Sequence, residues 1–474
     1  MSTKLYRNCL ISLFGLFFVL PAVAAVADSA AVAQCAINID CASNAGAVTP
    51  FAWGVVAPDK YTWWAGNTAL EARIRDAHIK LVRVNPIQIA MNNGRDPYPS
   101  PGQTQFAELD SILTTIFDSG AEPLFVVAGF PKGIAVSKDA NGYLSSVDWA
   151  EYARFMGQLV HRYNVEHVLG AGRSVRYWEM WNEPSIEGDG KFATKDAYKA
   201  FVEVVGGAMK KEDPAIQLVG PAAPWSDLGA DGWVAYTAQN LSGLIDILSW
   251  HDYGPGPGHD DGTVLGWTDK NYEDDVLAVN SGGDKNIFVS PSGKPIKTAI
   301  TEYNISWQNG DDSYNEKYHS QLNAVFAASS IVHAIRGKVT MFCFYNLAET
   351  GKNLLGLLSN TDYSPYKPYY VFSLFGNHFG DQLLNATGSS PNLESVAARQ
   401  SGSGKYSVVL VNKDLDKACD VVLNFGHMRS SHGVVRITQI DASSSVPVTI
   451  TQKYSESTFH YRLQPQAIVS VEIL

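Results

Sequence analysis

Length, composition and charge limit the classes of protein to which this chain can belong. Its 474 residues suffice for one large domain and a smaller one, and a hydrophobic fraction of 46% is ordinary for a globular protein. The formal net charge of −11 argues against a nucleic acid or an anionic membrane as partner.

The N-terminus has the pattern of an export signal. Lys4 and Arg7 precede an apolar run that ends near Val26, and small residues then offer a cleavage site before Asp28. We therefore expect residues 1–27 to be a signal peptide and the mature protein to be secreted or periplasmic. The run is short for a stable membrane span, and no later stretch is long and apolar enough, so we expect no membrane anchor.

The cysteines suggest one small disulfide loop. Cys35 and Cys41 are close in sequence within a segment rich in small residues, and an exported protein can keep them oxidised. Cys343 and Cys419 lie in apolar strands, where we expect buried, unpaired thiols. No spacing of Cys and His indicates a metal site, and no motif indicates a cofactor.

Eight apolar segments with strand character recur along the chain, each followed by a helical pattern. They cover residues 51–56, 80–85, 123–128, 177–183, 216–220, 245–253, 295–302 and 339–345. Strands that alternate with helices predict an α/β fold, here a (β/α)8 TIM barrel over residues 50–380. The helix after the first strand begins with Asn67 as N-cap.

The segments before and after the barrel have a residue pattern that differs from that of the barrel. Residues 28–49 are small and polar, and we expect this N-terminal extension to cross the surface before the first strand. Residues 381–474 contain short segments in which apolar and polar residues alternate, which predicts a C-terminal β-sandwich domain.

The longest gap between barrel strands follows the sixth one. The stretch Gly254–Gly258 cannot be regular structure, because it alternates glycine with proline. We expect residues 254–294 to form a loop over the active-site face, with Trp267 and Tyr272 in the wall of a cleft.

Two glutamates stand where catalytic residues of barrel enzymes lie. Glu183 ends the fourth strand, directly before Pro184, and Glu302 ends the seventh. Catalytic groups of TIM barrels lie at the C-terminal ends of the strands, and hydrolysis of a glycosidic bond requires two carboxyl groups on opposite sides of that bond. The alternative for either residue alone is a surface glutamate or a salt-bridge partner.

These motifs resemble the retaining glycoside hydrolases of clan A, the 4/7 superfamily, and most closely family 39. The resemblance rests on the segments Trp181–Pro184 and Thr301–Asn304 and on the pair His251 and Tyr253. It implies that Glu183 is the acid/base and Glu302 the nucleophile. It also implies that Glu183 holds its proton near neutral pH while Glu302 is ionised.

The same resemblance implies a set of substrate-binding residues. Asn182 would contact the hydroxyl next to the reacting carbon, Tyr253 would bond the nucleophile, and Arg83 would orient it; His251 and Trp181 complete the set. A core histidine and a structural ion pair are the alternatives for His251 and Arg83. The strand-eight sequence from Phe342 to Tyr345 lacks the tryptophan that often lies under the sugar in such enzymes.

The expected function is hydrolysis of O-glycosidic bonds in oligo- or polysaccharides by double displacement. A carbohydrate is the expected partner, and the resemblance includes β-xylosidases and bacterial exopolysaccharide hydrolases. Two alternatives stay open, a related clan A β-glucanase or glucosidase and a barrel that binds glycans without catalysis.

Overall fold

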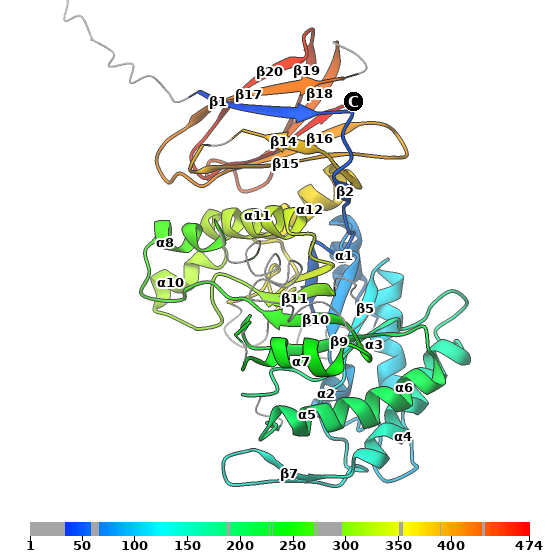
Figure 1. The fold of residues 1–474 in the computed structure, drawn as a ribbon. Helices are drawn as coiled ribbons and strands as arrows, with labels where there is room; N and C mark the ends of the chain where they lie inside the picture. The colour runs from blue at the N-terminus through cyan, green and yellow to red at the C-terminus, as the bar shows by residue number, and fades with distance from the viewer. Residues whose placement is uncertain are drawn as a thin grey trace, which may run out of the picture.

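The chain forms a barrel domain with a β-sandwich packed against one side of it (Figure 1). The computed structural model describes residues 34–57, 66–186, 190–226, 228–229, 231–269, 272, 296–349, 354–388, 390–428 and 432–474. The expected signal peptide lies outside these residues, as does most of the loop expected after the sixth strand.

The eight expected barrel strands are present, all parallel, and they close in chain order, which confirms the predicted fold. One apolar cluster takes residues from every strand, among them Leu81, Leu124 and Ile247, because inward-facing side chains fill a barrel of this size. The strands are β3 (Gly54–Val56), β4 (Leu81–Val84), β5 (Glu122–Val126), β8 (Tyr177–Glu179), β9 (Gln217–Ala223), β10 (Ile245–His251), β11 (Lys297–Tyr303) and β12 (Met341–Phe344).

Helices surround the barrel. Asn67 caps the first of them, as the sequence predicts, because its side chain accepts a hydrogen bond from the amide of Leu70. None of the helices among the described residues has the length and hydropathy to cross a bilayer. They are α1 (Thr68–Asp76), α2 (Pro86–Asn92), α3 (Ala107–Asp118), α4 (Trp149–Val160), α5 (Lys195–Phe201), α6 (Gly207–Glu212), α7 (Trp233–Leu241), α8 (Asp261–Gly266), α10 (Asp312–Lys317), α11 (Gln321–Arg336) and α12 (Tyr369–His378).

The sandwich consists of two sheets whose facing sides share a second apolar core. One sheet has the order β14 (Asn385–Thr387), β1 (Gln34–Asp40), β17 (Cys419–Gly426), β20 (Thr458–Leu463). The other has the order β19 (Val448–Tyr454), β18 (Gly433–Ile440), β21 (Ile468–Ile473), β16 (Tyr406–Asn412), β15 (Leu393–Arg399), β13 (Gln382–Leu383), β2 (Gly46–Ala47).

The N-terminal extension does not cross the surface as expected. Its strands β1 and β2 belong to the two sheets of the sandwich, so β1 lies among strands from the far end of the chain (Figure 1). β1 runs parallel to β17, and residues such as Ile37 and Ile39 bury one face of β1 in the sandwich core.

The expected pairing of the cysteines is wrong. Cys35 forms a disulfide with Cys419, at a Cα–Cα distance of 6.7 Å, whereas Cys41 is a free, buried thiol. The cause is the pairing of β1 with β17, which brings together residues separated by 384 positions in sequence. Cys343 is free and buried, as expected.

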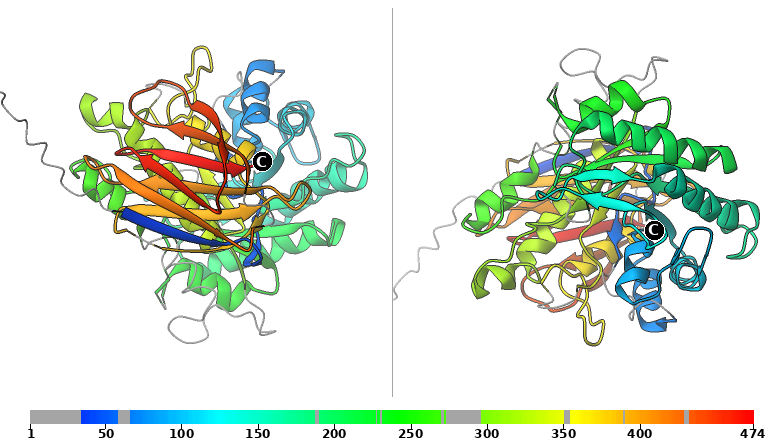
Figure 2. Two further views of the ribbon diagram at one scale, coloured as in Figure 1. Left: turned by 90° about the horizontal axis from the view of Figure 1, so that it is seen from above. Right: turned by 90° about the horizontal axis from the view of Figure 1, so that it is seen from below.

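Helix α11 joins the two domains into one unit. Figure 1 shows it between the barrel and the sandwich, and Figure 2 shows the sandwich sheets from above and the barrel from below. Every residue of α11 except Arg336 is buried, because the barrel covers one face and the sandwich the other. Gln321 of this helix also donates a hydrogen bond to the carbonyl of Gln466 in the sandwich, at 2.6 Å.

Candidate active site

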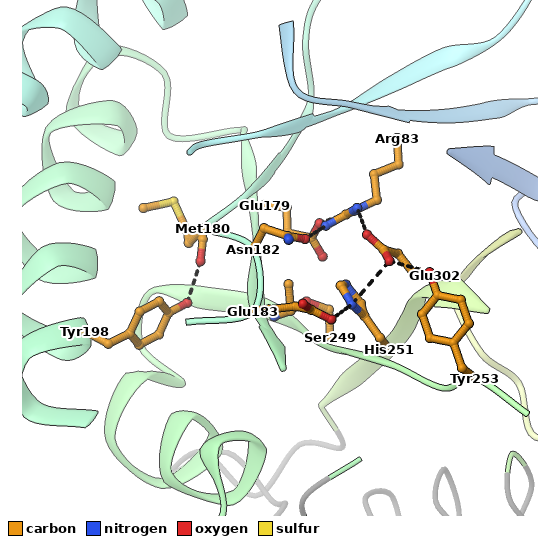
Figure 3. A network of polar contacts seen from close by, with 11 residues as sticks. Arg83, Glu179, Met180, Asn182, Glu183, Tyr198, Ser249, His251, Tyr253 and Glu302 are labelled. Atoms are coloured by element: carbon orange, nitrogen blue, oxygen red, sulfur yellow. Dashed lines mark hydrogen bonds and ion pairs between the residues drawn. The ribbon is translucent and has the colours of Figure 1, made fainter. Parts of the chain in front are cut away.

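The fourth strand ends in a turn that presents Glu183 at the mouth of the barrel. Trp181 and Glu183 adopt φ values of 87° and 43°, in the left-handed region, which costs about 1–3 kcal/mol for each residue. Surrounding hydrogen bonds hold this turn. The Tyr198 hydroxyl donates to the carbonyl of Met180 at 2.8 Å (Figure 3). The amide of Glu183 donates to the carbonyl of Ala222 at 2.9 Å.

Trp181 does not belong to the substrate-binding set that the resemblance implies. Its side chain is fully buried and packs against an aromatic cluster in which Phe130, Phe192 and Phe201 have ring centroids 5.1–5.5 Å away. An indole buries a large apolar surface in such a cluster. The expectation that Trp181 contacts the sugar is therefore wrong, and its role is to anchor the turn.

Arg83, at the end of β4, connects three groups at the barrel mouth. Its guanidinium donates to Glu179 at 2.5 Å, to Glu302 at 2.6 Å and to the amide oxygen of Asn182 at 2.6 Å (Figure 3). Burial by itself would lower the Arg83 pKa, but the carboxylates of Glu179 and Glu302 raise it overall. The arginine therefore stays charged and holds these groups in place.

Glu302 is held at both carboxylate oxygens. Arg83 donates to Oε1, and the Tyr253 hydroxyl donates to Oε2 at 2.6 Å. Burial and the Glu302 charge raise the Tyr253 pKa well above its usual range, so this tyrosine acts as a donor. Two such donors fix the orientation of the carboxylate.

His251, on β10, lies between the two glutamates and is fully buried. Its Nδ1 atom is 2.8 Å from Oε1 of Glu183 and 3.5 Å from Oε2 of Glu302 (Figure 3). Burial would lower the His251 pKa, but the charges of Glu302 and Glu183 raise it overall. These charges favour the protonated form of the imidazole next to Glu183.

The same contact reverses an expectation about Glu183. Burial would raise the pKa of this carboxyl, but its hydrogen bond to His251, together with the charges of His251 and Arg83, lowers it overall. The direction of this shift runs against the expectation that Glu183 itself holds a proton near neutral pH.

Residues of this group line two cavities. One, of about 210 Å³, is lined by Arg83, Asn182, Glu302 and Tyr345, with Gln88 and neighbouring residues of α2. The other, of about 390 Å³, includes His251 and Tyr253 in its wall. The hydrogen bond from Tyr253 to Glu302 therefore lies between the two cavities.

The long loop after β10 is confirmed in part. Trp267, at the end of α8, lines the larger cavity, as expected. Tyr272 instead is fully buried against Tyr303 and Phe342, with ring centroids at 6.3 and 5.3 Å. Residues 270, 271 and 273–294 of the expected loop lie outside the described residues.

Two groups of side chains have the donor atoms that a metal ion uses, but a basic side chain is part of each. Donor atoms of Glu183, His251 and Glu302 lie within 4.8 Å of one another, and Arg83 contacts Glu302. Those of Asp269, His333 and Glu394 also converge, around the ammonium of Lys413. A positive charge at each group disfavours a second cation there.

Several residues at the barrel mouth are missed by the reasoning from sequence. Glu179 lies two residues after Tyr177 on the same side of β8, and this spacing could have indicated that it points inward. Tyr345 directly follows β12 and lines the smaller cavity, at the strand where a tryptophan is common in such enzymes. Helix α2, with Gln88, begins directly after β4 at Pro86, a favourable first helical residue.

Carboxylates from the ends of the fourth and seventh strands of a parallel barrel are common to the clan A glycoside hydrolases, and this chain has the same arrangement. Residues 75–413 match the pattern described as "Glycosyl hydrolases family 39". Because the match covers well over half of the chain, the protein belongs to this family.

Curated relatives include two β-xylosidases. The chain is 25% identical to that of Geobacillus stearothermophilus over 337 residues, 66% of this chain and 62% of the relative. It is 21% identical to that of Caldicellulosiruptor saccharolyticus over 318 residues, 62% of this chain and 61% of the relative. The matched region thus spans about three fifths of the length of each relative.

Solved structures share the fold over nearly the whole chain. An arabinofuranosidase superimposes with a TM-score of 0.72 at 16% identity, covering 93% of this chain and all of the other. A β-xylosidase from Caulobacter crescentus superimposes with a TM-score of 0.67 at 15% identity, covering 92% of this chain and 99% of the other. At such identities the likeness establishes the fold alone.

Proposed function

We propose that the protein is a retaining glycoside hydrolase that cleaves O-glycosidic bonds of oligo- or polysaccharides by double displacement. The observation that carries this proposal is the position of the two glutamates, whose facing carboxylate oxygens lie within 4.8 Å of each other. Inverting enzymes keep their carboxyl groups roughly 6.5–9.5 Å apart to admit a water molecule, whereas retaining ones need about 5–5.5 Å.

Glu302 is the nucleophile in this proposal. Its carboxylate attacks the anomeric carbon, and the bond from that carbon to the leaving oxygen breaks as the bond to Glu302 forms. Arg83 and Tyr253 support this role, since their hydrogen bonds fix the orientation of the carboxylate.

Glu183 is the acid and then the base. The proton on Nδ1 of His251 moves over 2.8 Å to Glu183 and from there to the leaving oxygen. In the second step Glu183 takes a proton from water, whose oxygen attacks the anomeric carbon and releases Glu302. In this proposal the buried histidine supplies the proton that Glu183, with its lowered pKa, would otherwise lack.

The smaller cavity is the proposed site for the sugar that becomes attached to Glu302. Because Arg83 can only donate, the amide oxygen of Asn182 must face it, and this bond holds the Asn182 side chain in the wall of the cavity. The β-xylosidase relatives make β-xylosides the first substrates to test. Tyr345 supplies an aromatic surface in this cavity.

We also infer that the protein is exported. The apolar N-terminal segment favours export, and a disulfide between Cys35 and Cys419 is of the kind that persists in an oxidising compartment.

A covalent trapping experiment tests the mechanism. Wild-type protein is first assayed on a panel of aryl β-glycosides that begins with the β-xyloside, and the accepted sugar is then supplied as its 2-deoxy-2-fluoro glycosyl fluoride. We expect mass spectrometry to find one glycosyl adduct on Glu302 and NMR to find a first-formed product that retains the substrate configuration. An inverted product would contradict the proposal.

A further inference from the structure

Three tryptophans expose their rings into one cavity of the described structure. Trp225, Trp267 and Trp307 are 53%, 36% and 65% exposed, and every other tryptophan among the described residues is buried or half-buried. All three line the larger of the two cavities at the barrel mouth. Exposing three indoles in one place is costly, and such clustering is typical of a binding site.

The tryptophans come from three consecutive strand ends. Trp225 follows β9 by two residues, Trp267 lies in the segment after β10, and Trp307 follows β11 by four residues. Gly254 allows the last two segments to lie close together, because a Cβ atom there would be 2.5 Å from the carbonyl oxygen of Ile305. The amide of Gly254 also donates to the carbonyl of Asn304 at 2.8 Å, which fixes the segment that carries Trp307.

The position of this cavity relative to the glutamates determines its role. The smaller cavity contains Glu302 and Asn182, the groups that hold the attacked sugar in the proposed function. The tryptophan cavity has His251 in its wall, the residue that supplies the proton to Glu183 in the proposed function. Because the proton thus comes from the wall of the tryptophan cavity, the leaving group is expected on that side.

The chemistry of the wall favours a carbohydrate in this cavity. None of the lining residues is Leu, Ile, Val, Met or Phe, whereas a lipid site is lined by aliphatic groups. Indole faces can stack on the C–H faces of sugar rings, and polar groups between them can bond hydroxyls. The lining residues are Pro224, Trp225, Ser226, His251, Asp252, Tyr253, Gly254, Trp267 and Trp307.

We propose that this tryptophan cavity binds the leaving-group side of the substrate and that the leaving group is a chain of sugar units. The inference rests on the proposed function, because it assigns a substrate class to the same reaction centre. It implies that the chain of the leaving group contributes to transition-state binding, and that a bound sugar can also replace water as acceptor in the second step.

The test compares a substrate without a sugar leaving group with one that has it. Wild-type protein and the variants Trp225→Ala and Trp307→Ala are assayed on two substrates. One is the simple glycosyl fluoride of the accepted sugar, which keeps its 2-hydroxyl group and turns over, and the other is the tetrasaccharide of that sugar. The exposed Ile450 of the sandwich, changed to Ala, serves as the control. We expect each tryptophan variant to lose about tenfold or more in kcat/KM on the tetrasaccharide, about 1.4 kcal/mol, and to keep its activity on the fluoride.

A second measurement follows the acceptor. With the fluoride as donor and a disaccharide added, wild-type protein should form transfer products, and the tryptophan variants should form hydrolysis product instead at an unchanged total rate. Equal losses on both substrates, or no loss on either, would overturn the inference, as would transfer to simple aryl alcohols in place of sugars. A wild-type protein inactive on every glycoside would instead refute the proposed function itself.

Discussion

Nδ1 of His251 lies 2.8 Å from Oε1 of Glu183, within hydrogen-bond distance. The charges of Glu302 and Glu183 raise the His251 pKa above its usual 6.5, and the hydrogen bond to His251 outweighs the effect of burial and lowers the Glu183 pKa. The pair therefore keeps its proton until the pH rises through the raised pKa of the histidine.

This relationship predicts the pH dependence of catalysis. In wild-type protein, kcat/KM should fall with increasing pH along a limb that reports the His251 pKa, above 6.5. In His251→Gln, the proton must reside on Glu183, so the limb should move to lower pH. Tyr253→Phe is the matched control, because it removes a bond to Glu302 and leaves the Glu183–His251 pair intact. A limb at the same pH in His251→Gln and wild type would rule out the histidine as the proton source.

The two glutamates should respond differently to removal of the charge. Glu302→Gln should lose activity by on the order of 10⁴-fold or more on every glycoside, because no nucleophile remains. Glu183→Gln should lose about 10²–10⁴-fold on substrates with poor leaving groups and little in the glycosylation step of activated aryl glycosides, which need no acid. Azide should restore turnover of the activated substrates in Glu183→Gln. The exposed Glu203, changed to Gln, is the control; a uniform loss in Glu183→Gln on all substrates would contradict its role as acid.

The disulfide between Cys35 and Cys419 can be tested in the non-reduced protein. Peptide mapping should find these residues linked and Cys41 unmodified, since burial raises the pKa of the Cys41 thiol to about 11 and shields it. Reductant should lower the free energy of unfolding by about 2–5 kcal/mol, because the bridge closes a loop of 384 residues. The double variant Cys35→Ser/Cys419→Ser should be insensitive to reductant, and a linkage between Cys35 and Cys41 would refute the assignment.

Lys413 should be essential to the contact between the sandwich and the barrel. It is buried beside Glu394, 2.6 Å away, and it also contacts Asp269, which follows Trp267 in the segment after β10. Lys413→Met leaves the buried Glu394 without its lysine and should lower the free energy of unfolding in urea by about 3–5 kcal/mol. The contribution of Asp269 is smaller because its side chain is half-exposed. Adding Glu394→Gln should restore part of the loss, whereas the exposed Lys453→Met should change little.

The sequence by itself determined the barrel and the two glutamates. Strand and helix patterns alternate locally, and Glu183 and Glu302 each follow an apolar strand, so their place at one end of the barrel results from the order of the elements. Asn182, Arg83, His251 and Tyr253 were predictable in the same way, because each lies at or next to a strand end. These features depend on residues close in sequence or on the parallel arrangement itself.

Only the tertiary structure decided which aromatic side chains face the cleft and which cysteine pairs with Cys35. Trp181 and Trp225 each follow a barrel strand, yet one is buried among aromatic rings and the other is exposed at the cavity, because the packing of α4 and α5 differs from that of the segments around β10. Cys419 reaches Cys35 through strand pairing between the two ends of the chain. The pKa of Glu183 likewise depends on His251, 68 residues away in sequence. Such contacts arise from burial and pairing over long sequence separations, which local patterns do not encode.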